Sequence, residues 1–112
     1  MIPAQIYCIG VNHETAPLTV REGLACNPDL HDAMLKEKYP QIYEWAWIST
    51  CNRVELYAAC VCDLATEKVC NLFAELSGGD LEELQPYIYQ MHNEEASSHL
   101  LHVAAGLDSM VL

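Results

Sequence analysis

Basic residues are scarce in this chain of 112 residues. Lys and Arg number 5 against 16 Asp and Glu, which gives a formal net charge of −11 at pH 7. Proteins that hold a nucleic acid backbone do so mainly with Lys and Arg side chains that neutralise phosphates. This domain is therefore not expected to grip a phosphate backbone by itself, and any contact with RNA should be local or made mainly by other parts of the protein.

Several further signals are missing. No stretch of about 18 apolar residues occurs, so no transmembrane helix is predicted, and the N-terminus lacks the basic-then-apolar pattern of a secretory signal. Neither a G-x-G-x-x-G fingerprint nor a P-loop is present, so no phosphate cradle for a dinucleotide or a nucleoside triphosphate is expected. What remains is a chain with 52% hydrophobic residues, enough to bury the core of one domain.

The six cysteines lie mostly inside apolar segments. Cys8 stands in IYCIGV, and Cys60 and Cys62 stand in YAACVC. This placement is typical of buried, reduced thiols in a cytoplasmic protein rather than of a disulfide framework. The Cys60-x-Cys62 pair has neither the C-x-x-C spacing nor a second pair, so it is a weak candidate for a metal or redox site.

The order of apolar runs and capping residues predicts the fold. We expect helix starts at a Thr19-x-x-Glu22 capping box and at Asp29, Asp63, Asp80 and Asn93. Strands are predicted over residues 5–13, 45–50, 54–61 and 87–91, and the main helices over 19–25, 29–39, 64–77 and 93–106. The order β-α-α-β-β-α-β-α contains a split βαβ unit. We therefore predict an α+β fold, a ferredoxin-like sandwich with a four-stranded, mainly antiparallel sheet and extra helices.

One segment is a candidate for chemistry, Ser49-Thr50-Cys51-Asn52-Arg53 between two predicted strands. A cysteine at such a tight connection can be exposed on a rigid backbone, and Arg53 can favour its thiolate. Thr50 and Asn52 offer hydrogen bonds that could orient an acyl group. The competing interpretation is an ordinary turn with a buried, inert thiol.

The last predicted helix carries two histidines. At about 100° per residue, Ala96, Leu100, Val103, Ala104 and Leu107 share one face, His99 borders it, and His102 lies toward the opposite side. His99 is thus expected beside a core or cleft, as a boundary residue or a functional one, and His102 in solvent. His92, His99 and His102 do not converge in this geometry, so no metal site is predicted. Glu14, Glu22 and Glu55 lie near the Cys51 segment; such carboxylates are usually solvated, and we expect this of Glu22.

Three segments together resemble the glutamyl-tRNA reductase family. They are GVNHETAP (10–17) followed by VRE (20–22), STCNRVELY (49–57), and SHL (98–100) with VAAGLDSMVL (103–112). Their order and spacing also match, and they span the chain. The resemblance implies NADPH-dependent reduction of glutamyl-tRNA to glutamate 1-semialdehyde, the first step of five-carbon tetrapyrrole (porphyrin and haem) biosynthesis.

The resemblance also assigns residue roles. It implies that Cys51 is the nucleophile that forms a glutamyl thioester and that His99 is important for activity. A thiol suits this two-step route, because a thioester carbonyl accepts hydride more readily than an ester carbonyl. The glutamyl-recognition pocket would contain Thr50, Asn52, Arg53 and Ser109, with Arg53 paired to the free γ-carboxylate.

The same resemblance implies a domain organisation. Residues 1–112 would form the N-terminal catalytic domain that recognises glutamyl-tRNA, while the NADPH-binding and dimerisation domains would be absent from this chain. No NADPH site is then expected here, and the whole protein would be a homodimer whose candidate partner is the downstream semialdehyde aminomutase. The alternative is a non-catalytic ferredoxin-like interaction domain, which an exposed but unreactive Cys51 would favour. A generic cysteine hydrolase lacks a Cys-His-Asn or Cys-His-Asp framework.

Overall fold

The chain folds around one antiparallel sheet of four strands in the computed structural model, which describes residues 5–24, 36–60 and 66–106. The sheet order is β2-β3-β1-β4, so the first strand lies in the middle. The elements, in chain order, are β1 (Gln5–Asn12), α1 (Leu18–Glu22), β2 (Ile42–Ser49), β3 (Arg53–Cys60), α3 (Thr66–Ser77), α4 (Leu81–Leu84), the 3₁₀ helix η2 (Gln85–Tyr87), β4 (Tyr89–His92) and α5 (Glu94–Ala104). This confirms the predicted α+β class and the split βαβ arrangement.

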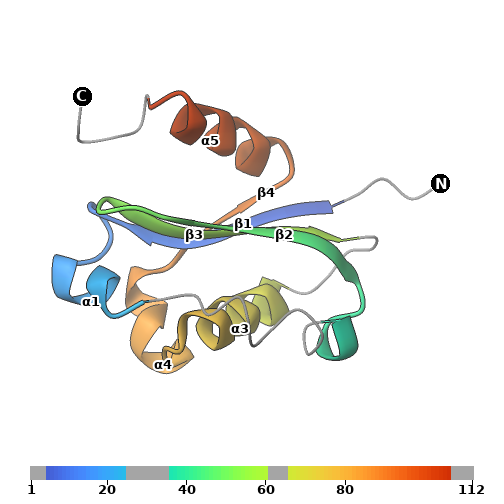
Figure 1. Cartoon of the computed structure of the whole chain (residues 1–112), viewed down its shortest axis with the longest axis horizontal. Helices are drawn as coiled ribbons and strands as arrows, with labels where there is room; N and C mark the ends of the chain where they lie inside the picture. Colours follow the sequence, from blue (N-terminus) through green and yellow to red (C-terminus); the bar gives the residue numbers. More distant parts are fainter. Residues whose placement is uncertain (1–4, 25–35, 61–65, 107–112) are drawn as a thin grey trace.

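Helices cover both faces of the sheet. Figure 1 shows α1, α3 and α4 on one side and α5 alone on the other. Side chains alternate across a strand, so Val54, Leu56 and Ala58 of β3 join the core under α3, while Tyr57 packs with Ala96 of α5 on the opposite face. We call these the α3 face and the α5 face. The fold is therefore a three-layer α/β/α arrangement rather than a sheet covered on one side.

The α3 face holds the main hydrophobic core. Phe73 is fully buried and stacks on Trp47 of β2, with ring centroids 5.3 Å apart. The sheet contributes Ile9 and Val11 from β1 and Val54 and Leu56 from β3. Helix α3 contributes the further buried side chains Val69, Leu72 and Leu76. Burial of this kind is the dominant favourable term in folding.

Most predicted boundaries agree with the structure, and three cap predictions can be checked. Asp80 caps α4 as expected, because its Oδ1 accepts a hydrogen bond of 3.0 Å from Glu82 N. The Thr19 capping box is wrong: α1 begins at Leu18 after Pro17, with no side-chain cap. Asn93 precedes α5 as predicted but does not cap it with its side chain. The caps at Asp29 and Asp63, and most of the predicted helix 29–39, lie outside the described residues.

Asn93 bonds to the first strand instead. Its Oδ1 accepts from Ile6 N at 2.9 Å, its own N–H donates to Ile6 O at 2.7 Å, and its Nδ2 donates to Gln5 Oε1 at 2.9 Å. The backbone at Asn93 has a positive φ of 52°, which is uncommon for a residue other than glycine. The chain therefore turns from β4 into α5 at a residue fixed to β1, which sets the position of α5 over the sheet.

Candidate functional site

The turn between β2 and β3 presents Cys51 to solvent. Thr50 N donates to Arg53 O at 2.8 Å, and Thr50 Oγ1 accepts from the backbone N–H groups of Asn52 and Arg53 at 3.2 and 3.3 Å. Asn52 O accepts from His13 N at 2.8 Å, which joins this turn to the end of β1. Thr50 and Asn52 thus hold the turn in shape, a structural task beside any role in substrate binding.

Cys51 differs from the other cysteines that the structure describes. It is exposed, whereas Cys8, Cys60 and Cys70 are buried. Burial, and secondarily the charge of Glu55, raises the pKa of the Cys8 thiol above its ordinary range, and burial also raises the pKa of Cys70. Both remain protonated thiols at neutral pH. The expected buried thiols at Cys8 and Cys60 are confirmed, while Cys62 lies outside the described residues.

Arg53 begins β3 and points to the α5 face, where it is 3% exposed. Its Nη1 lies 3.5 Å from Glu55 Oε2 and 3.4 Å from His99 Nε2. The predicted pairing of Arg53 with a substrate carboxylate therefore has a competitor in place, because Glu55 already accompanies the guanidinium. A substrate carboxylate would have to share this cation.

Glu55 is the residue that the sequence analysis did not select. It is fully buried in the middle of β3 and accepts hydrogen bonds from Tyr57 Oη on its Oε1, at 2.9 Å, and from Tyr89 Oη on its Oε2. A buried carboxylate without partners would be very costly, and here it has partners on both oxygens. Burial, with the nearby Glu55, raises the pKa of Tyr57 and of Tyr89, so both hydroxyls keep the proton that they donate.

Gly10 makes room for this carboxylate. It lies directly opposite Glu55 on the neighbouring strand β1. A Cβ at position 10 would stand 2.7 Å from Glu55 Cγ and 2.7 Å from Val54 O, closer than real side chains approach. Two sequence features together could have indicated that Glu55 is buried: the glycine in IYCIGV, which is Gly10, and the position of Glu55 inside an apolar strand.

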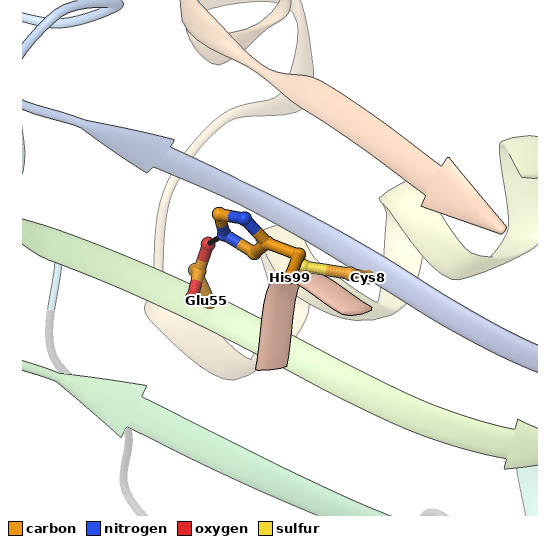
Figure 2. Close-up of side chains that lie close together, drawn as sticks. All are labelled: Cys8, Glu55 and His99. Atoms are coloured by element: carbon orange, nitrogen blue, oxygen red, sulfur yellow. Dashed lines mark hydrogen bonds and ion pairs between the residues drawn. The ribbon is translucent and has the colours of Figure 1, made fainter. Parts of the chain in front are cut away.

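His99 reaches the same cluster from α5. Its Nε2 lies 2.5 Å from Glu55 Oε2, and its side chain is 11% exposed. Figure 2 shows the ring turned toward Glu55 with Cys8 of β1 nearby. His102 is exposed, and its Nδ1 lies 2.7 Å from Ser98 O. The helical-angle prediction for these two histidines is confirmed, although Leu100 and Ala104, which were assigned to the buried face, are exposed.

The remaining predicted sites are separated from this cluster or cannot be placed. His92 stacks on Tyr7 of the α3 face, at 4.5 Å between centroids, so His92, His99 and His102 do not converge. Ser109 lies outside the described residues. His13, at the end of β1, holds a buried Nδ1 for which the described residues provide no hydrogen-bond partner. Its attachment to the Cys51 turn makes it a second residue of interest that the motif alone did not single out.

The arrangement has a clear chemical division. Cys51 is exposed on the β2–β3 turn. Arg53, two residues later, is buried and forms a cluster with Glu55 and His99. Such a cluster can hold an anionic group and position an imidazole for proton transfer. Among the described helices, none combines the length and apolar character that crossing a bilayer requires.

Comparisons with known proteins identify the family. The family described as glutamyl-tRNAGlu reductase, N-terminal domain, matches residues 9–112. Glutamyl-tRNA reductases from Thiobacillus denitrificans and a Picosynechococcus strain are 43% and 37% identical to the chain, each over 96% of it and 26% of their own length. The structure of glutamyl-tRNA reductase from Methanopyrus kandleri superposes with a TM-score of 0.66 at 24% identity, covering 94% of this chain and 23% of that one.

The structural match by itself shows only that the fold is shared. The sequence matches show that the chain is also a member of the family. The chain spans about a quarter of the length of the curated relatives that it matches. The segments around Cys51 and His99 both fall within the matched range, so the geometry described above lies in the part that is shared. The chain belongs to the glutamyl-tRNA reductase family, as its N-terminal domain.

Proposed function

We propose that this chain is the catalytic domain that accepts a glutamyl group from glutamyl-tRNA on Cys51. The observation that carries the proposal is the exposure of Cys51 on the β2–β3 turn, in contrast to the buried Cys8, Cys60 and Cys70. The Cys51 thiolate attacks the carbonyl carbon of the aminoacyl ester, the bond from that carbon to the ribose oxygen breaks, and a thioester forms. The departing oxygen takes a proton, for which His99 is the candidate donor.

Glu55 acts in this scheme as a positioning residue. It fixes the imidazole of His99 at one ring nitrogen and keeps Arg53 on the α5 face. Arg53 is the proposed partner of the free γ-carboxylate of the glutamyl group, which would share this cation with Glu55, since guanidinium groups bind carboxylates well. Thr50 and Asn52 contribute through the turn that they hold, and Ser109 is proposed as a further pocket residue on the basis of the family motif.

The whole protein is proposed to reduce this thioester to glutamate 1-semialdehyde, with NADPH supplying the hydride, in tetrapyrrole biosynthesis. The residues of this chain do not fit an NADPH site, because its sequence lacks a glycine-rich phosphate cradle. We therefore propose that the cofactor site lies in another domain. From the family resemblance we propose the same for the contacts of a homodimer. The downstream semialdehyde aminomutase is proposed as the partner that receives the product. The buried thiols of Cys8 and Cys70 support a reducing compartment, and we propose the cytoplasm.

Thiol mapping tests the nucleophile directly. With limiting iodoacetamide, Cys51 should be alkylated first, before the buried Cys8, Cys60 and Cys70, and peptide mapping by mass spectrometry identifies the site. Preferential labelling of Cys60 or Cys70 in the folded protein would contradict the assignment. An unreactive Cys51 would favour an interaction domain without catalysis.

The glutamyl adduct is the second test. Incubation with glutamyl-tRNA should add one glutamyl group, which mass spectrometry detects on the Cys51 peptide and which hydroxylamine removes. Cys51→Ala should abolish the adduct, and Cys70→Ala is the matched control that should keep it. An adduct that persists in Cys51→Ala would overturn the role of Cys51.

A further inference from the structure

We propose that Cys8, Glu55 and His99 form a binding site for one zinc ion on the α5 face, a site that competes with the arrangement required for glutamyl transfer. The three side chains come from β1, β3 and α5. One possible ligand atom from each, the Cys8 sulfur, a Glu55 carboxylate oxygen and a His99 ring nitrogen, lie within 4.8 Å of one another. Figure 2 shows them gathered over the two central strands.

The distances fit a tetrahedral ion after small movements. Bond lengths of about 2.0–2.3 Å to nitrogen, oxygen and sulfur place neighbouring ligand atoms roughly 3.3–3.6 Å apart around zinc. His99 Nε2 and Glu55 Oε2 now stand closer than that, at 2.5 Å, so a bound ion would separate them by about 1 Å. The Cys8 sulfur, which lies within 4.8 Å of the other two ligand atoms, would move inward by at most about 1.5 Å.

The ligand types select the metal. A thiolate, an imidazole and a carboxylate together suit zinc, whereas magnesium and calcium require mainly oxygen ligands. Three protein ligands leave a fourth position for water, the usual form of an open zinc site. Tyr57 Oη donates to Glu55 Oε1, so the carboxylate already has an outer partner that would orient it toward an ion.

Zinc binding changes the charges in the cluster. Binding releases the thiol proton of Cys8 to solvent, because a coordinating thiol is deprotonated. The ion then neutralises its two negative ligands, so Arg53, whose Nη1 is 3.5 Å from Glu55 Oε2, loses its counter-charge and must move away from the ion. The chain's net charge of −11 also favours the approach of a cation.

Access is limited, which sets the kinetics. Glu55 and Cys8 are fully buried and only the edge of His99 reaches solvent. An ion must therefore enter past His99 while α5 moves away from the sheet, and we expect slow association. The functional consequence, inhibition by zinc, rests on the proposed function, because it requires His99 and Arg53 to act in glutamyl transfer; the binding itself does not.

Cobalt substitution tests the site without any assay of activity. The protein carrying Cys51→Ser, which removes the exposed thiol, is titrated with Co²⁺ under reducing conditions. We expect the near-ultraviolet charge-transfer band of a thiolate–cobalt bond, saturating at one ion per chain and displaced by Zn²⁺. Adding Cys8→Ala should abolish the band, and adding Cys70→Ala, which removes a buried thiol on the α3 face, should leave it unchanged.

Two results would overturn the site: a band that survives Cys8→Ala, or no stoichiometric band in the Cys51→Ser protein. Circular dichroism checks the fold of each variant. If Cys8→Ala unfolds, His99→Gln at the rim provides the same test, with an affinity for cobalt expected to fall at least about tenfold.

Inhibition is measured separately in the whole protein with Cys51 intact. Zinc should inhibit glutamyl transfer, a chelator should restore it, and Cys8→Ala should be resistant. If cobalt binds at Cys8 but zinc does not inhibit, the metal site stands and the proposed roles of His99 and Arg53 fail.

Discussion

The two faces of the sheet are built from the same strands but differ in composition: one carries an apolar core and the other a buried polar cluster. On the α3 face, β3 contributes Val54 and Leu56 to an apolar core built around Phe73. On the α5 face, the alternate residues of that strand are Arg53, Glu55 and Tyr57, and they meet polar side chains from β4 and α5. The comparison indicates that most of the stabilising burial lies under α3. Apolar burial on that face offsets the desolvation cost of the charged cluster on the α5 face.

The largest loss of stability should come from the α3 face. Phe73→Ala removes a fully buried ring stacked on Trp47 and should lower the free energy of unfolding by about 3–5 kcal/mol. Urea denaturation measures this, with Leu101→Ala as the control, since Leu101 is 71% exposed. A decrease in unfolding free energy below about 1 kcal/mol for Phe73→Ala would mean that Phe73 is not at the centre of the hydrophobic core.

The next effect should come from the centre of the α5 face. Glu55→Gln keeps the shape but removes the charge that Arg53, His99 and two tyrosine hydroxyls surround, and it should cost about 1.5–3 kcal/mol. Glutamyl transfer should fall far more than in Phe73→Ala protein assayed at equal folded fraction. Equal rates of glutamyl transfer for Glu55→Gln and the unmodified protein would show that Glu55 has no role in catalysis.

A change on β1 should reach Glu55 indirectly. Gly10→Ala inserts a methyl group 2.7 Å from Glu55 Cγ, which should cost about 1–3 kcal/mol and slow glutamyl transfer. Gly23→Ala is the matched control, because its Cβ would meet no described neighbour closer than 3.5 Å. Urea denaturation and the transfer assay should distinguish the two, and a Gly10→Ala protein as stable and active as Gly23→Ala would refute the space requirement.

The smallest effect should appear as a pH dependence. Because the pKa values of Tyr57 and Tyr89 are raised in the folded state, mainly by burial, the folded protein holds their protons at pH values where the unfolded chain loses them. Their contribution is complete below about pH 10, the ordinary tyrosine pKa, and is lost as the pH rises toward the folded value.

The slope of unfolding free energy against pH above pH 10 should therefore be negative, by at most about 1.4 kcal/mol per pH unit for each group. Tyr57→Phe should make it shallower, while Tyr43→Phe, at a residue 55% exposed, should not. Identical slopes for the two variants would show that the hydroxyl of Tyr57 is not protected in the way that its burial indicates.

Sequence patterns predicted the two faces unequally. The apolar runs and turn residues were sufficient to predict the four strands and their antiparallel sheet, because burial of apolar area dominates sheet formation. Cys51, Arg53 and His99 were found through motif and helical angle. Glu55 was not, since a glutamate inside a strand is ordinarily solvated, and its burial depends on Gly10 and Tyr89, which lie far from it in sequence. The role of Asn93 was missed for the same reason, because its partner Ile6 is 87 residues away.

The order of the strands has a consequence for how the chain is made. Of the four described strands, β1 is synthesised first, yet it lies between β3 and β4, so both of its edges stay unpaired until those strands are made. β3 begins about 40 residues later, which at roughly 5–20 residues per second leaves β1 unpaired for roughly 2–8 seconds. An apolar strand with two open edges is a template for wrong pairing. During synthesis, β1 is therefore the strand that most needs protection by a chaperone.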